Sequence, residues 1–118
     1  MAEFSVEIRD RAGTAVVDLR GDLDGRAGTA VDAACAEAVR SDRQAIVLNF
    51  AEVGYINSSG IALIVGMLAD ARRQAIQVGV VGLSDHYRHI FEITRLADFM
   101  TFLGSEDEAI GNGMTAPA

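Results

Sequence analysis

Alternation of apolar and polar residues near the start of the chain predicts two short strands. Residues 4–8 (Phe-Ser-Val-Glu-Ile) have the period of two that is typical of a half-buried strand, and residues 15–19 form a second, more apolar strand-like run. The turn residues at 12–14 favour an opening hairpin. We expect the pattern to break at residues 21–25, where Gly-Asp-Leu-Asp-Gly is typical of a turn.

Two later segments carry apolar residues at helical spacing. Residues 26–40 are rich in alanine, which predicts a helix with a shallow apolar face packed closely on a sheet. The residues after 60 predict a more apolar helix that ends near Arg72 and Arg73. Between the helices, the apolar run at residues 44–50 predicts a central strand covered on both faces. The predicted apolar faces comprise Ala27, Val31, Ala34, Cys35 and Ala38 in the first helix and Ile61, Ile64, Val65 and Leu68 in the second.

The rest of the chain continues the alternation of strands and helices. Residues 76–81 predict a strand, Ser84 is a favourable N-cap for the next helix, and residues 99–103 predict a short last strand. Acidic residues from 106 onwards suit the first turn of a final helix, and residues 111–118 are expected to fray. The order ββαβαβαβα favours an α/β fold with parallel strand pairs after the hairpin, in one domain over residues 1–110.

Composition and charge narrow the functions that this domain can have. The chain has 118 residues, 50% of them apolar, and a formal net charge of −7. That charge disfavours direct binding of nucleic acid or of anionic membranes. All ten cations are arginine, so lysine-dependent chemistry such as Schiff-base formation is excluded. We see no leader and no apolar run of the roughly 18 residues that a membrane span needs, and expect a cytoplasmic monomer or weak dimer.

Candidate metal-binding and catalytic residues are few. Cys35 lies on a predicted apolar face and is expected to be a buried structural thiol. His86 and His89 lack the neighbours of a zinc site and are expected to face solvent. Residues 21–25 lack the further ligands of a calcium loop, and Ser58 is not flanked as in a Gly-x-Ser-x-Gly nucleophile elbow. We therefore expect no metal, no cofactor and no catalytic activity.

The segment Asn57-Ser58-Ser59-Gly60, at a strand-to-helix junction, is the best candidate for function. A helix start leaves backbone N–H groups unpaired and carries partial positive charge. In an open α/β sheet, the loops at the carboxyl ends of the strands form the usual ligand edge. A serine hydroxyl here can cap the helix, or it can be phosphorylated, with the added charge near the exposed N–H groups. Helix statistics alone favour the cap.

Over about residues 4–110 the chain resembles the STAS-domain proteins of the bacterial anti-sigma factor antagonist family. The most specific segment is residues 55–63 (Tyr-Ile-Asn-Ser-Ser-Gly-Ile-Ala-Leu). The frame is set by residues 19–24 (Leu-Arg-Gly-Asp-Leu-Asp), 45–50 (Ala-Ile-Val-Leu-Asn-Phe) and 83–91 (Leu-Ser-Asp-His-Tyr-Arg-His-Ile-Phe). The resemblance implies the STAS fold, a mixed β-sheet of four to five strands packed against about four helices.

The resemblance also implies a function as a regulatory switch. The unphosphorylated protein would bind a GHKL-type serine kinase that is also the anti-sigma factor, and so free the sigma factor. Phosphorylation at Ser58 would abolish that binding, and a PP2C-type phosphatase would reverse it. Many family members have aspartate where this chain has Asn57, which brings no negative charge. The implied partner-binding residues are Asp22, Asp24, Asn57, Ser58, Ser59, Gly60 and Ile61.

Two other functions remain open from the sequence. The same fold can serve as a non-switching scaffold or accessory subunit, as in stressosome-like or lipid-transport-like assemblies, in which Ser58 is only a helix cap. A weaker alternative is a small-molecule or nucleotide-binding module that uses the same helix start. Any exposed side chain among Ile61, Leu63 and Met67 would extend a partner surface.

Overall fold

The predicted N-terminal hairpin opens a five-stranded mixed sheet in the computed structural model, which describes residues 3–40 and 44–111. The strands follow one another across the sheet in chain order. The first pair is antiparallel and every later pair is parallel, as the sequence predicted. The strands are β1 (Ser5–Arg11), β2 (Thr14–Leu23), β3 (Ala45–Ile56), β4 (Gln77–Val81) and β5 (Thr101–Phe102).

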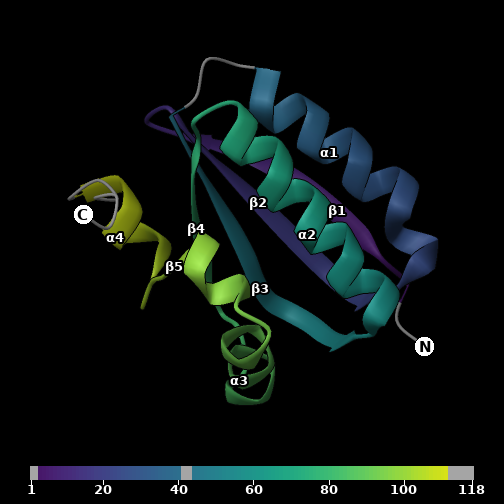
Figure 1. Cartoon of the computed structure of the whole chain (residues 1–118). Helices are drawn as coiled ribbons and strands as arrows, with labels where there is room; N and C mark the ends of the chain where they lie inside the picture. Colours follow the sequence, from purple (N-terminus) through teal and green to yellow (C-terminus); the bar gives the residue numbers. More distant parts are fainter. Residues whose placement is uncertain (1–2, 41–43, 112–118) are drawn as a thin grey trace.

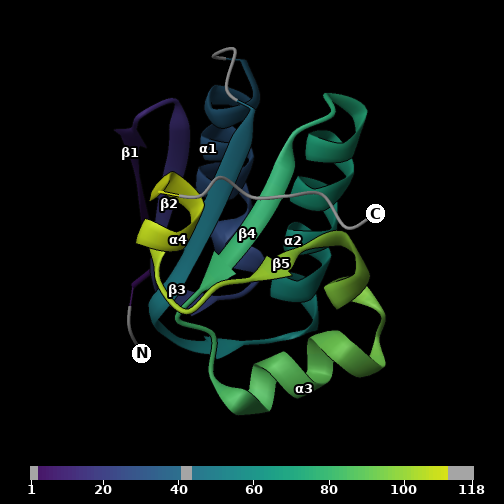
Figure 2. The same ribbon diagram turned by 90° about the vertical axis from the view of Figure 1, so that its left-hand side faces the viewer.

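Helices cover both faces of the sheet and one of its ends. Figure 1 shows α1 and α2 side by side on one face and α4 on the other, and Figure 2 shows α3 below the end of the sheet where β3 leads into α2. No helix in the described part of the chain is both long and apolar enough to span a membrane. The helices are η1 (Gly25–Ala27, 3-10), α1 (Gly28–Arg40), α2 (Ser58–Arg73), α3 (Asp85–Ile93), η2 (Leu96–Phe99, 3-10) and α4 (Glu106–Gly111).

The central strand β3 is buried on both faces, which confirms the interpretation of its apolar run. Ile46 and Leu48 belong to the large core beneath α1 and α2. Val47 points to the opposite face, where it joins a smaller cluster that includes Ala109 of α4. Alternate side chains of one strand therefore supply two separate hydrophobic layers, and the short helix α4 closes the second.

Three sequence predictions were wrong, two about element boundaries and one about a buried side chain. β2 does not break at Gly21: this residue takes a left-handed φ of +94°, and the strand continues because Leu19 and Leu23 keep the apolar alternation. Val65 is 44% exposed, because α2 turns Ile64 and Leu68 toward the sheet instead. The last strand covers only two residues, since Phe99 lies in η2. Fraying was predicted for residues 111–118, of which residues 112–118 lie outside the described part of the chain.

A network of ion pairs fastens α4 to the hairpin. Asp18 of β2 is only 4% exposed and accepts hydrogen bonds from Arg9 Nε at 2.6 Å and from Asn49 Nδ2 at 2.8 Å. Arg9 also binds Glu106 at the start of α4 (Nη2 to Oε2, 2.9 Å), and Arg11 binds the same carboxylate at 2.7 Å. The hydrogen bonds from Arg9 hold the pKa of both carboxyl groups below their usual values.

The substitution Asp18→Asn is expected to lower the free energy of unfolding at pH 7 by roughly 1–3 kcal/mol, since it removes a nearly buried, charge-assisted acceptor. A carboxyl group whose pKa is lower in the folded than in the unfolded protein stabilises the folded state at pH values above its pKa in the unfolded chain. This contribution is lost as the pH falls through its pKa in the folded protein. The difference in the free energy of unfolding between wild type and variant, measured by urea titration, should therefore narrow below about pH 4.

A matched control is Asp107→Asn, which removes a carboxylate bound to Arg11 at 2.9 Å but 78% exposed. Its effect should stay within about 0.5 kcal/mol at any pH, because exposed ion pairs contribute little. Equal losses for the two variants would contradict the assignment of Asp18 as the anchor of the network.

Candidate functional site

The candidate site lies where β2 and β3 end at the same edge of the sheet. The two strands are parallel, and their last paired residues are Leu23 and Ile56. The backbone N–H of Asn57 then donates to the carbonyl of Leu23 at 3.2 Å. As a result Ser58, the first residue of α2, directly follows the carboxyl end of the central strand, as Figure 1 shows at the lower end of α2.

Asn57, and not Ser58, caps α2. Asn57 has extended backbone angles (φ −101°, ψ −175°), and its side-chain Oδ1 accepts from the N–H of Gly60 at 2.9 Å. Its carbonyl accepts the first helical bond, from Ile61 N at 2.9 Å. This is the geometry of an N-cap residue whose amide oxygen satisfies one of the unpaired N–H groups of the first turn. The hydroxyl of Ser58 is therefore not needed to start the helix.

The two serines present their hydroxyls to solvent. Ser58 and Ser59 are both exposed, whereas Gly60 is buried and Ile61 half-buried. Within residues 3–40 and 44–111, neither hydroxyl makes a hydrogen bond, so each is available to a reagent or a partner. Of the apolar residues considered as an extension of this surface, Leu63 is half-buried and Met67 is buried, so Met67 contributes nothing to it.

Glycine at position 60 allows α2 to approach the end of β2. A Cβ atom built on Gly60 would lie 2.0 Å from the carbonyl oxygen of Leu23, which no side chain tolerates. The turn after β2 also packs beside the serines, because a Cβ on Gly25 would lie 3.6 Å from Cβ of Ser59. The structure thus brings residues 22–25 and 57–61 together at one edge of the sheet.

Asp24 flanks the serines, but its carboxylate is already bound within its own loop. It caps η1 by accepting from the backbone N–H of Arg26 at 2.9 Å, and it forms an ion pair with Nη2 of the same residue at 2.7 Å. The hydrogen bonds from the Arg26 side chain and backbone lower the pKa of Asp24. Asp22 is half-buried and pairs in register with Tyr55. The acid that flanks Ser59 in this loop, Asp24, is therefore neutralised by Arg26.

Sequence reasoning missed two tyrosines at this edge. The backbone N–H of Ile56 donates to the hydroxyl of Tyr87 at 2.9 Å, which ties α3 to the end of β3. Tyr55 is 51% exposed beside the same strand end. Tyr87 was named only within the segment 83–91, and a hydroxyl on a helix that packs against the sheet is the signal that a polar partner lies beneath it.

The remaining candidate residues are Cys35 of α1 and two histidines of α3, the helix that lies at this edge. Cys35 is buried as predicted; burial raises the pKa of its thiol, whose Sγ lies 3.5 Å from Oδ2 of Asp70. His86 and His89 are exposed, and the ring of His86 packs edge-on against Tyr87. Among the residues with a described position, no group of three or more His, Cys, Asp or Glu side chains could hold a metal ion.

Comparison with known proteins identifies the family. The protein-family model described as the STAS domain matches residues 4–109 of this chain. The anti-sigma-B factor antagonist of Listeria monocytogenes serovar 1/2a is 34% identical over 113 residues, which cover 92% of this chain and 96% of the relative. Both matches extend over nearly the whole chain, so they include the edge formed by β2, β3 and α2.

Solved structures of similar fold agree with this assignment. The Bacillus cell fate determinant SpoIIAA in its phosphorylated form superposes with a TM-score of 0.72 at 26% identity, covering 95% of this chain and 100% of that one. An anti-sigma factor antagonist from Mycobacterium paratuberculosis has a TM-score of 0.79 at 20% identity, with 93% of each chain covered, and shows the fold alone. The chain therefore belongs to the STAS-domain family of anti-sigma factor antagonists.

Proposed function

We propose that this protein is a phosphorylation-controlled switch in a bacterial partner-switching module. The unphosphorylated form binds a GHKL-type serine kinase that is also an anti-sigma factor, and thereby frees the sigma factor. The kinase phosphorylates Ser58, binding is lost, and a PP2C-type phosphatase restores the first state. The protein acts in the cytoplasm, without catalytic activity of its own.

The observation that carries this proposal is the exposed, unbonded hydroxyl of Ser58 beside a cap made by another residue. The side chain of Asn57 accepts the hydrogen bond from the N–H of Gly60, so the hydroxyl of Ser58 is not needed to cap the helix. An exposed serine on a rigid helix terminus is accessible to a kinase. The family membership supports the same residue, because the resemblance aligns Ser58 with the family's phosphoacceptor serine.

The free domain can accept a phosphate at Ser58 without refolding. Of the four N–H groups that a helix start leaves without helical partners, Asn57 N binds Leu23 and Gly60 N binds the Asn57 side chain. The N–H groups of Ser58 and Ser59 remain beside the modified oxygen. A phosphate with a charge of about −1.5 to −2 is stabilised there by these donors and by the helix dipole.

Bound to a partner, the same phosphate is strongly unfavourable. The unmodified edge is small and carries a neutralised acid, since Asp24 is paired with Arg26. A partner can therefore cover Asp24 without desolvating an unpaired carboxylate at that residue. A dianion buried at the centre of this contact would cost several kcal/mol, which corresponds to a loss of affinity of a hundredfold or more. The switch thus acts through desolvation at the interface and not through a change of fold.

Asparagine at position 57 fits this mechanism. Its amide oxygen makes the same cap bond that an aspartate would make, but without a negative charge next to Ser58. Adding phosphate at Ser58 then meets less electrostatic repulsion than beside an aspartate. The unmodified edge is also closer to neutral, which suits a surface that a partner must desolvate.

The division between cap and phosphoacceptor predicts different stabilities for neighbouring variants. Asn57→Ala is expected to lower the free energy of unfolding by about 1 kcal/mol, because it removes the side-chain cap. Ser58→Ala should cost less than about 0.5 kcal/mol, as expected of an exposed residue without a structural bond. Urea titrations monitored by circular dichroism measure both. If Ser58→Ala were the more destabilising change, Ser58 would be the structural cap and the proposal would lose its main support.

Charge at Ser58 is expected to abolish partner binding. Candidate serine kinases of the same genome are first incubated with the protein and ATP, and intact mass and peptide mapping locate the phosphate. For a kinase that modifies Ser58, calorimetry should show Ser58→Ala binding within about threefold of wild type and Ser58→Asp at least about tenfold weaker, since a buried unpaired charge is so costly.

The matched control is Ser105→Asp, which adds the same charge at the start of α4 on the opposite face of the sheet. It should leave binding unchanged. A stable complex that is indifferent to Ser58→Asp would instead favour the non-switching scaffold or accessory subunit. Phosphate mapped only to Ser59 would also contradict the assignment of Ser58.

A further inference from the structure

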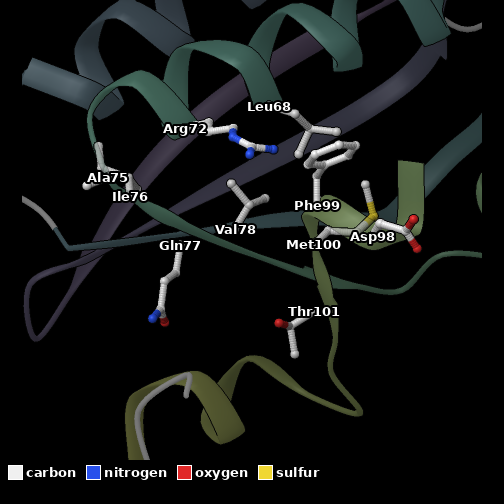
Figure 3. A pocket seen from close by; sticks show the side chains of 10 residues that line it. All are labelled: Leu68, Arg72, Ala75, Ile76, Gln77, Val78, Asp98, Phe99, Met100 and Thr101. Carbon is white, nitrogen blue, oxygen red and sulfur yellow. The ribbon is translucent and has the colours of Figure 1, made fainter. Parts of the chain in front are cut away.

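A groove lies at the opposite end of α2 from Ser58, where the last turns of this helix face η2 and the start of β4. Its volume is about 550 Å³, and Figure 3 shows the side chains that line it. The distance along the helix axis from Ser58 to Arg72 is about 20 Å at 1.5 Å per residue. The groove is therefore a separate feature from the edge proposed to bind the anti-sigma factor.

The floor of the groove is apolar. Leu68 of α2, Ile76 before β4, Val78 of β4 and Met100 line it, and each is buried by the surrounding protein. The large ring of Phe99 forms one wall and is 48% exposed. The volume is within the range of pockets that hold small organic molecules, about 300–1,000 Å³.

The apolar surface continues around the Phe99 ring into a second hollow of about 250 Å³. The two hollows share Leu68, Arg72 and Phe99. Val65, the residue of α2 that sequence analysis placed in the core, lines the second hollow and is exposed there. An alkyl chain lying along this surface would cover apolar side chains that the domain itself leaves open to water.

Arg72 is the cation of this groove, and it is available to an anion. Its guanidinium lies over the Phe99 ring, 5.2 Å from the centroid. An aromatic ring does not take up the N–H donors of a guanidinium as a carboxylate would, so these donors stay open to an anion. Within the described residues, Arg72 has no carboxylate partner. Ion pairs are formed by Arg9, Arg11, Arg20, Arg26, Arg73, Arg88 and Arg95.

The other polar groups of the groove do not compensate this charge. Asp98 lines the rim, but its carboxylate is bound by Arg95 Nε at 2.8 Å. Gln77 and Thr101 are uncharged. The groove thus combines an apolar floor with a single cationic side chain on its α2 wall, which matches a ligand that has an apolar body and one negative charge.

We propose that this groove binds a small amphipathic carboxylate, with its alkyl body on the apolar floor and its carboxylate on Arg72. The planar guanidinium offers two parallel N–H donors, the arrangement that binds a carboxylate most tightly. The proposal does not depend on the switch at Ser58, and either can fail without the other.

Octanoate is the probe, and 1-octanol is its uncharged counterpart of equal chain length. Titration of the full-length, isotope-labelled protein, followed by backbone amide shifts in NMR spectra, should locate octanoate at Val78 and Thr101 with a dissociation constant of about millimolar, as expected for some ten heavy atoms. Arg72→Gln should weaken octanoate binding about tenfold by removing the charge-assisted bonds. Binding of 1-octanol should be weaker than that of octanoate and unaffected by this substitution.

The matched control is Arg73→Gln, which changes the neighbouring arginine that is already paired with Asp70. It should bind octanoate as the wild type does, and so should Ser58→Asp. The inference is overturned if 1-octanol binds as tightly as octanoate, if Arg72→Gln leaves the affinity unchanged, or if the perturbed amides lie outside the groove. Amide spectra of the free variants establish that each is folded before the titration.

Discussion

The close approach of α2 to the end of β2, made possible by the missing side chain of Gly60, is the contact on which the site depends. The Leu23 carbonyl occupies the space that any Cβ would need, 2.0 Å from its position. The same carbonyl accepts the N–H of Asn57, so the first turn of the helix is held against the last residue of the strand. Because β2 and β3 are parallel and end together, this one contact places Ser58 and the turn that holds Asp24 on a common edge.

Around that edge, the residues that hold the local structure differ from Ser58, the residue proposed to be phosphorylated. Asn57 satisfies the helix start, Tyr87 satisfies the last N–H of β3, and Arg26 holds Asp24. None of these bonds involves the hydroxyl of Ser58. A chemical change at that hydroxyl therefore meets a local structure that is already complete, and its effect falls on whatever covers the edge. The domain can be rigid and still respond to modification, since no internal bond has to break.

Much of the fold and the place of the site were predictable from local patterns, whereas pairings between distant residues were not. The apolar run of β3 and the Ser84 cap of α3 are visible in the sequence, and both are present. Gly21 suggested a break because glycine permits turns, but here it absorbs an irregularity inside β2. Asn57 and Ser58 are both favourable caps, so only the backbone angles separate their roles. The Tyr87 bond to β3 joins residues 31 positions apart, and no local pattern contains it.

The net charge of −7 has less bearing on the proposed switch than the distribution of that charge. Exposed charges more than about 8–10 Å apart are largely screened at physiological ionic strength. The acids of the α4 network lie on the opposite face of the sheet from α2, and Asp24, the acid that caps η1 at the site, is neutralised by Arg26. The Asp24–Arg26 pair beside Ser58 is thus neutral, and Asp22 is the other acid of residues 22–25. A partner can desolvate this pair at lower cost than an unpaired carboxylate, and one added phosphate changes the charge of the surface around Ser58. The same reasoning applies to Arg72, which has no carboxylate partner within residues 3–40 and 44–111. The chain as a whole repels anions, but the attraction between Arg72 and an anion in direct contact is stronger than the screened repulsion from distant charges.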